Sequence, residues 1–170
     1  LRSATVRTQS RWENTTGLGN DDVRLKSLEV FAQASAEDPA IFLSKNELYV
    51  ALEVWLKQPL SGLCVGFDLT REHGEVVLRS YDTDQSPGRF VPLQSGANVR
   101  HCVIPPGLLN AGRFFIAPRV SIHNQEWIVN GDPLISFTIN LTHGKSAFWN
   151  VLHEGNRPGV VAPIFAWEKK

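Results

Sequence analysis

Apolar and polar residues alternate along much of the chain from Val23 onward. In the segment 48–57, leucine and valine occupy every second position, and polar or aromatic residues occupy most of the positions between them. Successive side chains of a β-strand point to opposite faces, so this pattern predicts a strand with one buried face. A second alternating segment, 63–70, is followed by a turn at 72–75. The segment 76–81 is then expected to return as a hairpin partner.

Further strands are predicted by short apolar runs that end at turn residues. Glycine, proline, asparagine and aspartate bound these runs, as they do at chain reversals. The additional predicted strands are 23–31, 99–104, 114–122, 127–129, 133–141 and 160–167. No segment has a convincing amphipathic-helix pattern, and about seven to nine short strands are typical of a sandwich. We expect an all-β protein with an antiparallel immunoglobulin-like β-sandwich; a jelly-roll-like variant or a closed barrel is the alternative.

A polar stretch precedes the first predicted strand. Residues 1–21 contain no long apolar segment, so we interpret them as a linker or tail, and residues 22–170 as one β-sandwich domain. The stretch 142–158 lacks periodicity and is expected to be a long excursion before the last strand. The chain begins with Leu1 and contains no methionine, which we interpret as a sign of a fragment or a processed form.

Charge and cysteine content narrow the choice of partners. The 17 Lys and Arg residues balance 17 Asp and Glu residues, so no net charge attracts nucleic acid, and we expect no nucleic-acid partner. No apolar run is long enough to cross a bilayer. Cys64 and Cys102 have no spacing motif, so two free thiols are expected rather than a disulfide.

The sequence gives little sign of catalysis or of metal binding. Residues 143–146 end like a phosphate-binding loop, but Ile139 stands where that motif needs its first glycine. The five histidines lack the close pairing of a zinc site, and neither cysteine lies near another ligand. A nucleophile elbow is also missing. We therefore expect no catalytic residue, no metal site and no cofactor.

Aromatic and polar residues at outward-facing strand positions are the candidate binding residues. They are Tyr49, Trp55, Arg79, Tyr81, Arg119, His123 and Trp127. Aromatic rings can stack on the apolar C–H face of a pyranose, and planar donors can bond its hydroxyl groups. Guanidinium groups also suit a carboxylate or phosphate substituent. The pattern favours a carbohydrate-binding surface, whereas a single tryptophan on a sandwich is more often core or covered by a partner.

Four stretches resemble the C-terminal domain of Wzt-type ATPase subunits, which belong to the ABC transporters that export bacterial O-antigen polysaccharide. They are an opening strand at 22–30, a hairpin with a Gly-centred turn at 65–77, a strand entry with Gly-Arg at 104–114, and the ending 156–167. The resemblance implies an immunoglobulin-like domain that binds the non-reducing end of the O-antigen in the cytoplasm, peripheral to the inner membrane. It also implies a homodimer whose C-terminal strands are able to exchange between protomers, and two further partners, an ATPase domain and the membrane subunit of the exporter.

Two other functions stay open from the sequence. One is a structural β-sandwich that dimerises or docks another protein and binds no glycan. The other is a glycoside-processing enzyme, which would need two carboxylates that converge on a cleft at a defined separation. We rank the enzyme last, because no such pair is evident among the predicted strands.

Overall fold

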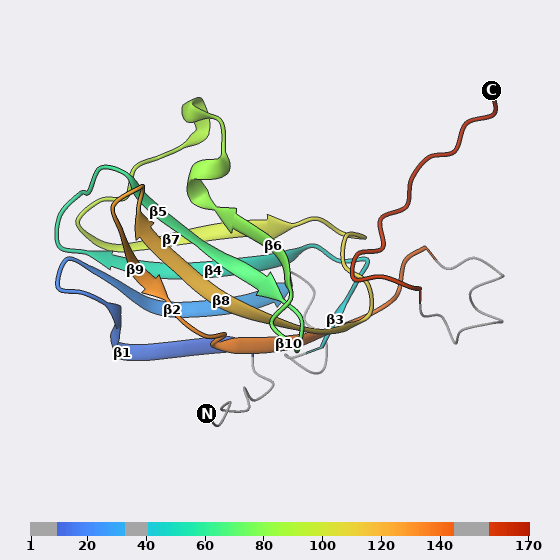
Figure 1. Cartoon of the computed structure of the whole chain (residues 1–170), viewed down its shortest axis with the longest axis horizontal. Helices are drawn as coiled ribbons and strands as arrows, with labels where there is room; N and C mark the ends of the chain where they lie inside the picture. Colours follow the sequence, from blue (N-terminus) through green and yellow to red (C-terminus); the bar gives the residue numbers. More distant parts are fainter. Residues whose placement is uncertain (1–9, 33–40, 145–156) are drawn as a thin grey trace.

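A computed structural model describes residues 10–32, 41–144 and 157–170 (Figure 1). These parts of the chain contain ten strands, two short 3₁₀ helices and no α-helix. The strands are β1 Arg11–Gly19, β2 Val23–Ala32, β3 Ile41–Leu43, β4 Leu48–Leu56, β5 Leu63–Thr70, β6 Val76–Tyr81, β7 Gly96–Ile104, β8 Gly112–Ile122, β9 Glu126–Asn130 and β10 Ile135–Asn140. The 3₁₀ helices are η1, Asp82–Asp84, and η2, Pro87–Arg89. None of the described helices is long and apolar enough to span a membrane.

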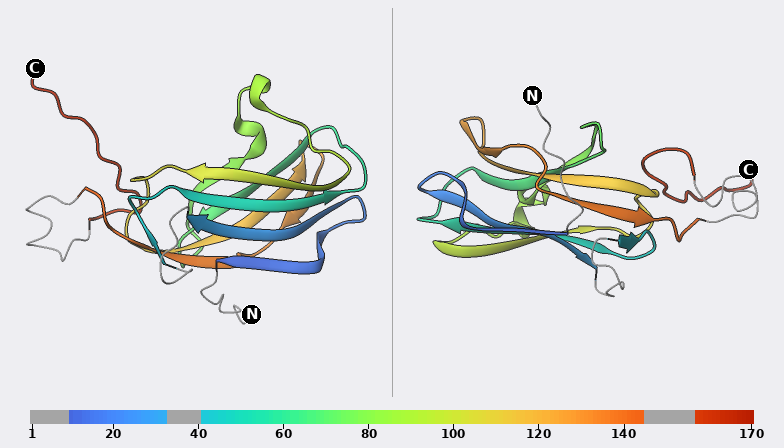
Figure 2. Two further views of the ribbon diagram at one scale, coloured as in Figure 1. Left: turned by 180° about the vertical axis from the view of Figure 1, so that it is seen from behind. Right: turned by 90° about the horizontal axis from the view of Figure 1, so that it is seen from below.

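The strands form two sheets that pack face to face around one core (Figure 2). The four-stranded sheet has the order β1-β2-β4-β7, and the six-stranded sheet has the order β3-β10-β8-β5-β6, with β9 also paired to β8. All pairs are antiparallel except the short parallel pair of β3 with β10. The prediction of an all-β sandwich is therefore confirmed.

The core follows from the alternating pattern of β4 and β5. The even-numbered residues of β4, Leu48 to Leu56, are all buried and face the other sheet. Burying each such aliphatic side chain contributes about 1.5–3 kcal/mol to folding. Strand β5 differs because all of its residues are buried, including Asp68 and Thr70 on its outer side. Side chains on the outer face of the six-stranded sheet must therefore cover β5.

Two predictions for the ends of the chain are wrong. Part of the expected linker forms strand β1, which pairs with β2 through Arg11 to Glu13 and again at Leu18 and Gly19. This strand lies at a sheet edge, so most of its side chains are exposed and its sequence shows no alternation. The predicted last strand at 160–167 is also missing, since only Val161 forms a bridge, to Leu109. Most of the predicted excursion 142–158 lies outside the described residues.

The C-terminal segment is fixed to one end of the sandwich and then leaves it (Figure 1). Asn110 Nδ2 donates to the carbonyl of Arg157 at 2.5 Å and to that of Gly159 at 2.7 Å. His143 Nε2 lies 2.7 Å from the carbonyl of Ala162. Beyond this anchor the apolar side chains are exposed, up to 95% for Trp167. The chain thus presents an apolar arm that packs on none of the described core.

Candidate functional site

A buried carboxylate organises the outer face of the six-stranded sheet. The side chain of Asp68 on β5 is only 2% exposed. Arg79 on β6 donates to it from Nε at 2.5 Å and from Nη2 at 2.8 Å, and Arg119 on β8 donates from Nε at 3.0 Å. Both arginines reach Asp68 because β5 lies between β6 and β8, with Asp68 paired to Arg79 and the neighbouring outward residue, Gly66, paired to Arg119. These arginines cover the outer side of β5 at Asp68.

The ion pairs keep all three groups charged. The hydrogen bond from Arg79 lowers the pKa of Asp68, and this effect outweighs the desolvation that would raise it. The same bond raises the pKa of Arg79 above its usual value. One carboxylate and two guanidinium groups leave one excess positive charge at this point of the sheet. Removing Asp68 would leave two neighbouring cations without their shared counter-ion.

The two arginines are held in place, and Arg79 supports an exposed indole ring. Nη1 of Arg119 donates to the carbonyls of Pro118 at 2.9 Å and Gly131 at 2.8 Å, in addition to its bond with Asp68. The guanidinium carbon of Arg79 lies 5.7 Å from the ring centroid of Trp127, which is within cation–π range. Trp127, on β9, is 48% exposed. Its ring is therefore supported from within the protein and open to a ligand.

A groove of about 520 Å³ lies between the η1 turn and the β8–β9 hairpin. Cys64 of β5 and Ser121 of β8, which are paired in the sheet, belong to its lining. Tyr81 and Trp127 contribute aromatic rings. The remaining lining residues are mostly polar: Thr83, Asp84, Ile122, His123, Asn124, Gln125 and Glu126. The groove thus combines aromatic rings with hydroxyl, carboxylate, imidazole and amide groups.

Local backbone geometry positions the two ends of this groove. Asn124 has a φ of 56°, a left-handed conformation that asparagine tolerates better than most residues, and it forms the tight turn between β8 and β9. On the other side, Gly66 lies opposite Tyr81 in the β5–β6 pair. A Cβ atom at Gly66 would lie 2.7 Å from Cδ1 of Tyr81, so the tyrosine ring packs directly against the glycine. Burial also raises the pKa of Tyr81, which keeps its phenol protonated.

The structure gathers five of the seven candidate residues on this one face. Tyr81, His123 and Trp127 line the groove, while Arg79 and Arg119 belong to the Asp68 cluster beside it. These five come from β6, β8, β9 and the turn after β8, which are separated in the sequence but adjacent in the sheet.

The other two candidates, Tyr49 and Trp55, lie on the outer face of the four-stranded sheet, on the opposite side of the sandwich. Tyr49 stacks on Phe31 with ring centroids 5.2 Å apart. Trp55 lines a separate hollow of about 330 Å³ with Asp21, Arg24 and Lys26. The seven candidates therefore do not form one site.

Sequence reasoning missed the residue that connects the cluster. Asp68 is the one charged residue of β5, in a strand whose other residues are apolar or small and uncharged. A carboxylate in such a strand needs a partner when it is buried, and this was the available signal. The polar residues Thr83, Asp84 and Asn124 to Glu126 gave no signal, because they lie in turns. No group of three or more His, Cys, Asp or Glu residues suited to a metal occurs in the described parts of the chain.

Comparison with known proteins supports the fold. Neither a protein-family model nor a curated protein matches the sequence. The structure is similar to the crystal structure of the C-terminal domain of Wzt, with a TM-score of 0.61 over 97% of this chain and 91% of that chain. The two sequences are 14% identical, so the likeness is one of fold. The neighbour belongs to the family that the sequence motifs resemble.

Proposed function

We propose that the protein is a non-catalytic carbohydrate-binding domain that binds a bacterial O-antigen polysaccharide, at its non-reducing terminus, and selects it for export by an ABC transporter. The observation that carries this proposal is the groove beside Trp127, which combines aromatic rings with a polar lining. Its volume lies within the usual range of ligand sites, roughly 300–1,000 Å³. The fold likeness to the C-terminal domain of Wzt supports the transport setting.

A sugar ring would bind by stacking on Trp127 and by hydrogen bonds to the polar lining. The indole presents a flat apolar surface to the C–H face of a pyranose. His123, Gln125 and Glu126 on one side and Thr83 on the other supply donors and acceptors for the hydroxyl groups. Because the Asp68 cluster fixes Arg79 beside the indole, little conformational entropy is lost when a sugar binds.

Arg79 contributes mainly by holding Trp127, and Arg119 by holding Asp68. Two nitrogen atoms of Arg79 and one of Arg119 already donate to Asp68, and Nη1 of Arg119 bonds backbone carbonyls. Neutral sugar hydroxyls are therefore the main polar groups recognised. The one excess positive charge also makes the face compatible with a carboxylate or phosphate substituent, though the remaining donors are few.

Dimerisation is a second candidate function, and the C-terminal arm favours it. Ile164, Phe165 and Trp167 are exposed beyond the anchor formed by Asn110 and His143. Exposed apolar side chains in an extended segment are typical of surfaces that pair with another chain. The proposed assembly is a homodimer with exchanged C-terminal arms, located in the cytoplasm and joined to the exporter through an ATPase domain and a membrane subunit. Light scattering of the protein ending at Ala162 tests this, because loss of the arm is expected to give a monomer.

Titration calorimetry against O-polysaccharides with intact and with chemically removed non-reducing termini tests the binding proposal. Saturable binding that depends on the terminus is expected, with no shortening of the polysaccharide after long incubation. Chain shortening would favour an enzyme, for which Asp84 and Glu126 are the carboxylates that line the groove. No heat from any polysaccharide, including that of the source organism, would contradict glycan binding and leave dimerisation or docking as the function.

A further inference from the structure

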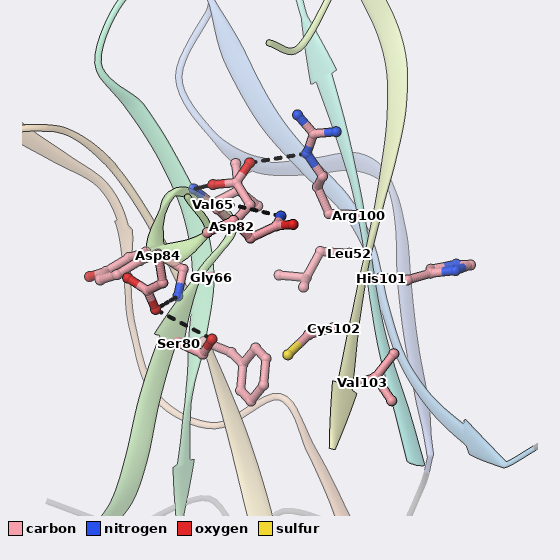
Figure 3. A pocket seen from close by; sticks show the side chains of 13 residues that line it. Leu52, Val65, Gly66, Ser80, Asp82, Asp84, Arg100, His101, Cys102 and Val103 are labelled. Carbon is pink, nitrogen blue, oxygen red and sulfur yellow. Dashed lines mark hydrogen bonds and ion pairs between the residues drawn. The ribbon is translucent and has the colours of Figure 1, made fainter. Parts of the chain in front are cut away.

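A second hollow opens between the two sheets, on the side where β6 and β7 form the sheet edges (Figure 3). Its volume is about 380 Å³. Leu52 of β4 and Val65 and Phe67 of β5 form its apolar part, and all three belong to the hydrophobic core. We call this hollow the inter-sheet cleft. It is separate from the outer groove, which lies on the outside of the six-stranded sheet.

The cleft exists because the edge strands carry small or polar residues at inward positions. Arg100 and Cys102 of β7 are paired with Leu52 and Val50 of β4, whose side chains face the other sheet. Ser80 of β6 is paired with Phe67 of β5 in the same way. A serine and a cysteine fill much less space than the leucines and valines of the inner strands. A hollow is therefore left beside the core on this side.

One end of the cleft is closed by an ion pair that joins the sheets. Nε of Arg100 lies 3.0 Å from Oδ2 of Asp82, and Oδ1 of Asp82 accepts a hydrogen bond from the backbone N–H of Val65 at 3.0 Å. The Asp82 side chain is only 6% exposed. This end of the cleft is fixed and has no net charge, because Arg100 balances Asp82.

The same 3₁₀ helix, η1, places a second carboxylate on the rim, and this one has no cationic partner among the described residues. Asp84 accepts the backbone N–H of Tyr81 at 2.8 Å and the hydroxyl of Ser80 at 3.5 Å, through the same oxygen, Oδ2. Figure 3 shows Asp84 beside Ser80, across the cleft from Cys102. Burial raises the pKa of the Cys102 thiol, so this wall is uncharged at neutral pH. The lining thus has an apolar floor and one excess negative charge.

We propose that the inter-sheet cleft is a second binding site, for a small molecule with an apolar body and an amine that donates to Asp84. The apolar body would fill the space beside Leu52, Phe67 and Cys102 and make van der Waals contacts with them. The amine would form a charge-assisted hydrogen bond with the carboxylate at the rim. A carboxylic acid of the same size would be repelled, because it would bring a second negative charge to Asp84.

This site does not depend on the proposed glycan function. Tyr81 and Asp84 line both hollows, however, so a ligand in the cleft touches the same turn that borders the outer groove. An effect of one ligand on the affinity for the other would be a coupling free energy between two sites. The test of the cleft uses its own probe and its own reporter residues, so its failure would leave the glycan proposal unaffected.

NMR titration of the ¹⁵N-labelled protein with benzylamine, and with benzoate as the matched anion, tests the proposal. Benzylamine is expected to give saturable shifts at the amides of Phe67, Ser80 and Cys102, with a dissociation constant on the order of 1 mM for so small a probe. Benzoate is expected to give none. Asp84→Asn is expected to weaken benzylamine binding about tenfold, because the ionic acceptor is lost.

Two variants of β7 separate binding in the cleft from a general effect on the fold. Cys102→Leu fills the cleft with apolar atoms, so it is expected to keep or raise the unfolding temperature and to abolish the benzylamine shifts. Val99→Leu changes an exposed residue of the same strand and is expected to leave binding unchanged. The proposal is overturned by equal shifts with benzoate, by shifts that persist in Cys102→Leu, or by shifts that occur only at His123 and Trp127.

Discussion

The two outer faces of the sandwich carry similar residues in different arrangements. On the six-stranded face, two arginines meet at the buried carboxylate of Asp68, and Trp127 packs beside them at the edge of a groove. On the four-stranded face, Tyr49 stacks on Phe31, and Trp55 lies in a smaller hollow near the β1–β2 turn. Only the first arrangement has a buried charge that fixes the surrounding side chains.

The difference shows what makes a surface suitable for recognition. Aromatic residues are present on both faces, so their presence does not distinguish a site from ordinary surface. The six-stranded face adds rigidity, because hydrogen bonds from β6 and β8 converge on β5. Its hollow is also larger, with about 520 Å³ against about 330 Å³ on the four-stranded face. We therefore expect substitutions on the two faces to differ in their effect on stability and on glycan binding.

The largest effect is expected from Asp68→Asn. The asparagine keeps the shape but leaves the largely buried Arg119 without its counter-ion, so the free energy of unfolding should fall by about 3 kcal/mol. The pKa of Asp68 is lowered in the folded state, so its contribution is present above the unfolded value of about 3.9 and is lost as the pH falls through the folded value. The difference in the free energy of unfolding between the unsubstituted protein and Asp68→Asn should therefore narrow below about pH 4.

Urea denaturation at several pH values measures this difference in the free energy of unfolding, and Asp132→Asn serves as the exposed control. The control is expected to change stability by less than about 0.5 kcal/mol. An equally small effect of Asp68→Asn at neutral pH would mean that the cluster is not a stabilising centre, and the contrast between the faces would lose its basis.

Gly66→Ala is expected to have the next largest effect. The added Cβ would lie 2.0 Å from the carbonyl oxygen of Ser80 and would press on the Tyr81 ring, so β5 and β6 must separate slightly. Such overpacking costs roughly 1–3 kcal/mol and should also weaken glycan binding by displacing Tyr81. Thermal unfolding and calorimetry measure the two effects. Gly88→Ala, where no atom lies within 4 Å of the new Cβ, is the matched control and is expected to be neutral.

Trp127→Ala and Trp55→Ala compare the two faces directly. Loss of the Trp127 ring removes the stacking surface, so glycan affinity should fall about tenfold, which corresponds to about 1.4 kcal/mol. Trp55→Ala should leave the affinity within about twofold. Calorimetry with one polysaccharide measures both. A larger loss for Trp55→Ala would place the site on the four-stranded face.

Tyr49→Leu is expected to have the smallest effect. It removes the stacked contact with Phe31 but keeps an apolar side chain, so the loss of stability should be about 0.5–1 kcal/mol. Glycan affinity should not change, because the ring lies on the opposite sheet from the groove. A loss of affinity without a loss of stability would show that Tyr49 contacts the ligand.

Most of the fold could be predicted from the sequence, because the fold depends on strands in which apolar and polar residues alternate. Strands such as β4, with leucine and valine at every second position, are specified by local pattern and burial. Strand β1 was not predictable in this way, since an edge strand can be polar on both faces. The predicted strand at 160–167 has the apolar composition of a strand but pairs with no strand in the described parts of the chain, and composition does not reveal that.

The candidate site was predictable only in part for a related reason. Strand phase shows that Tyr49, Trp55, Arg79 and Arg119 face outward, but not which sheet each belongs to. That assignment depends on the pairing of β5 with β6 and β8, which is a long-range property. The residues of the β8–β9 turn and of η1 meet only because those pairings bring them to the same end of the sheet.

An NMR titration with an O-polysaccharide fragment that carries the intact terminus shows most directly whether the groove on the six-stranded face binds the glycan. Binding in the groove is expected to give saturable shifts of the amides in residues 81–84 and 121–127, together with the indole N–H of Trp127. Saturable shifts confined to residues 24–31, 49–55 or 99–103 would contradict it, since those residues belong to the four-stranded sheet.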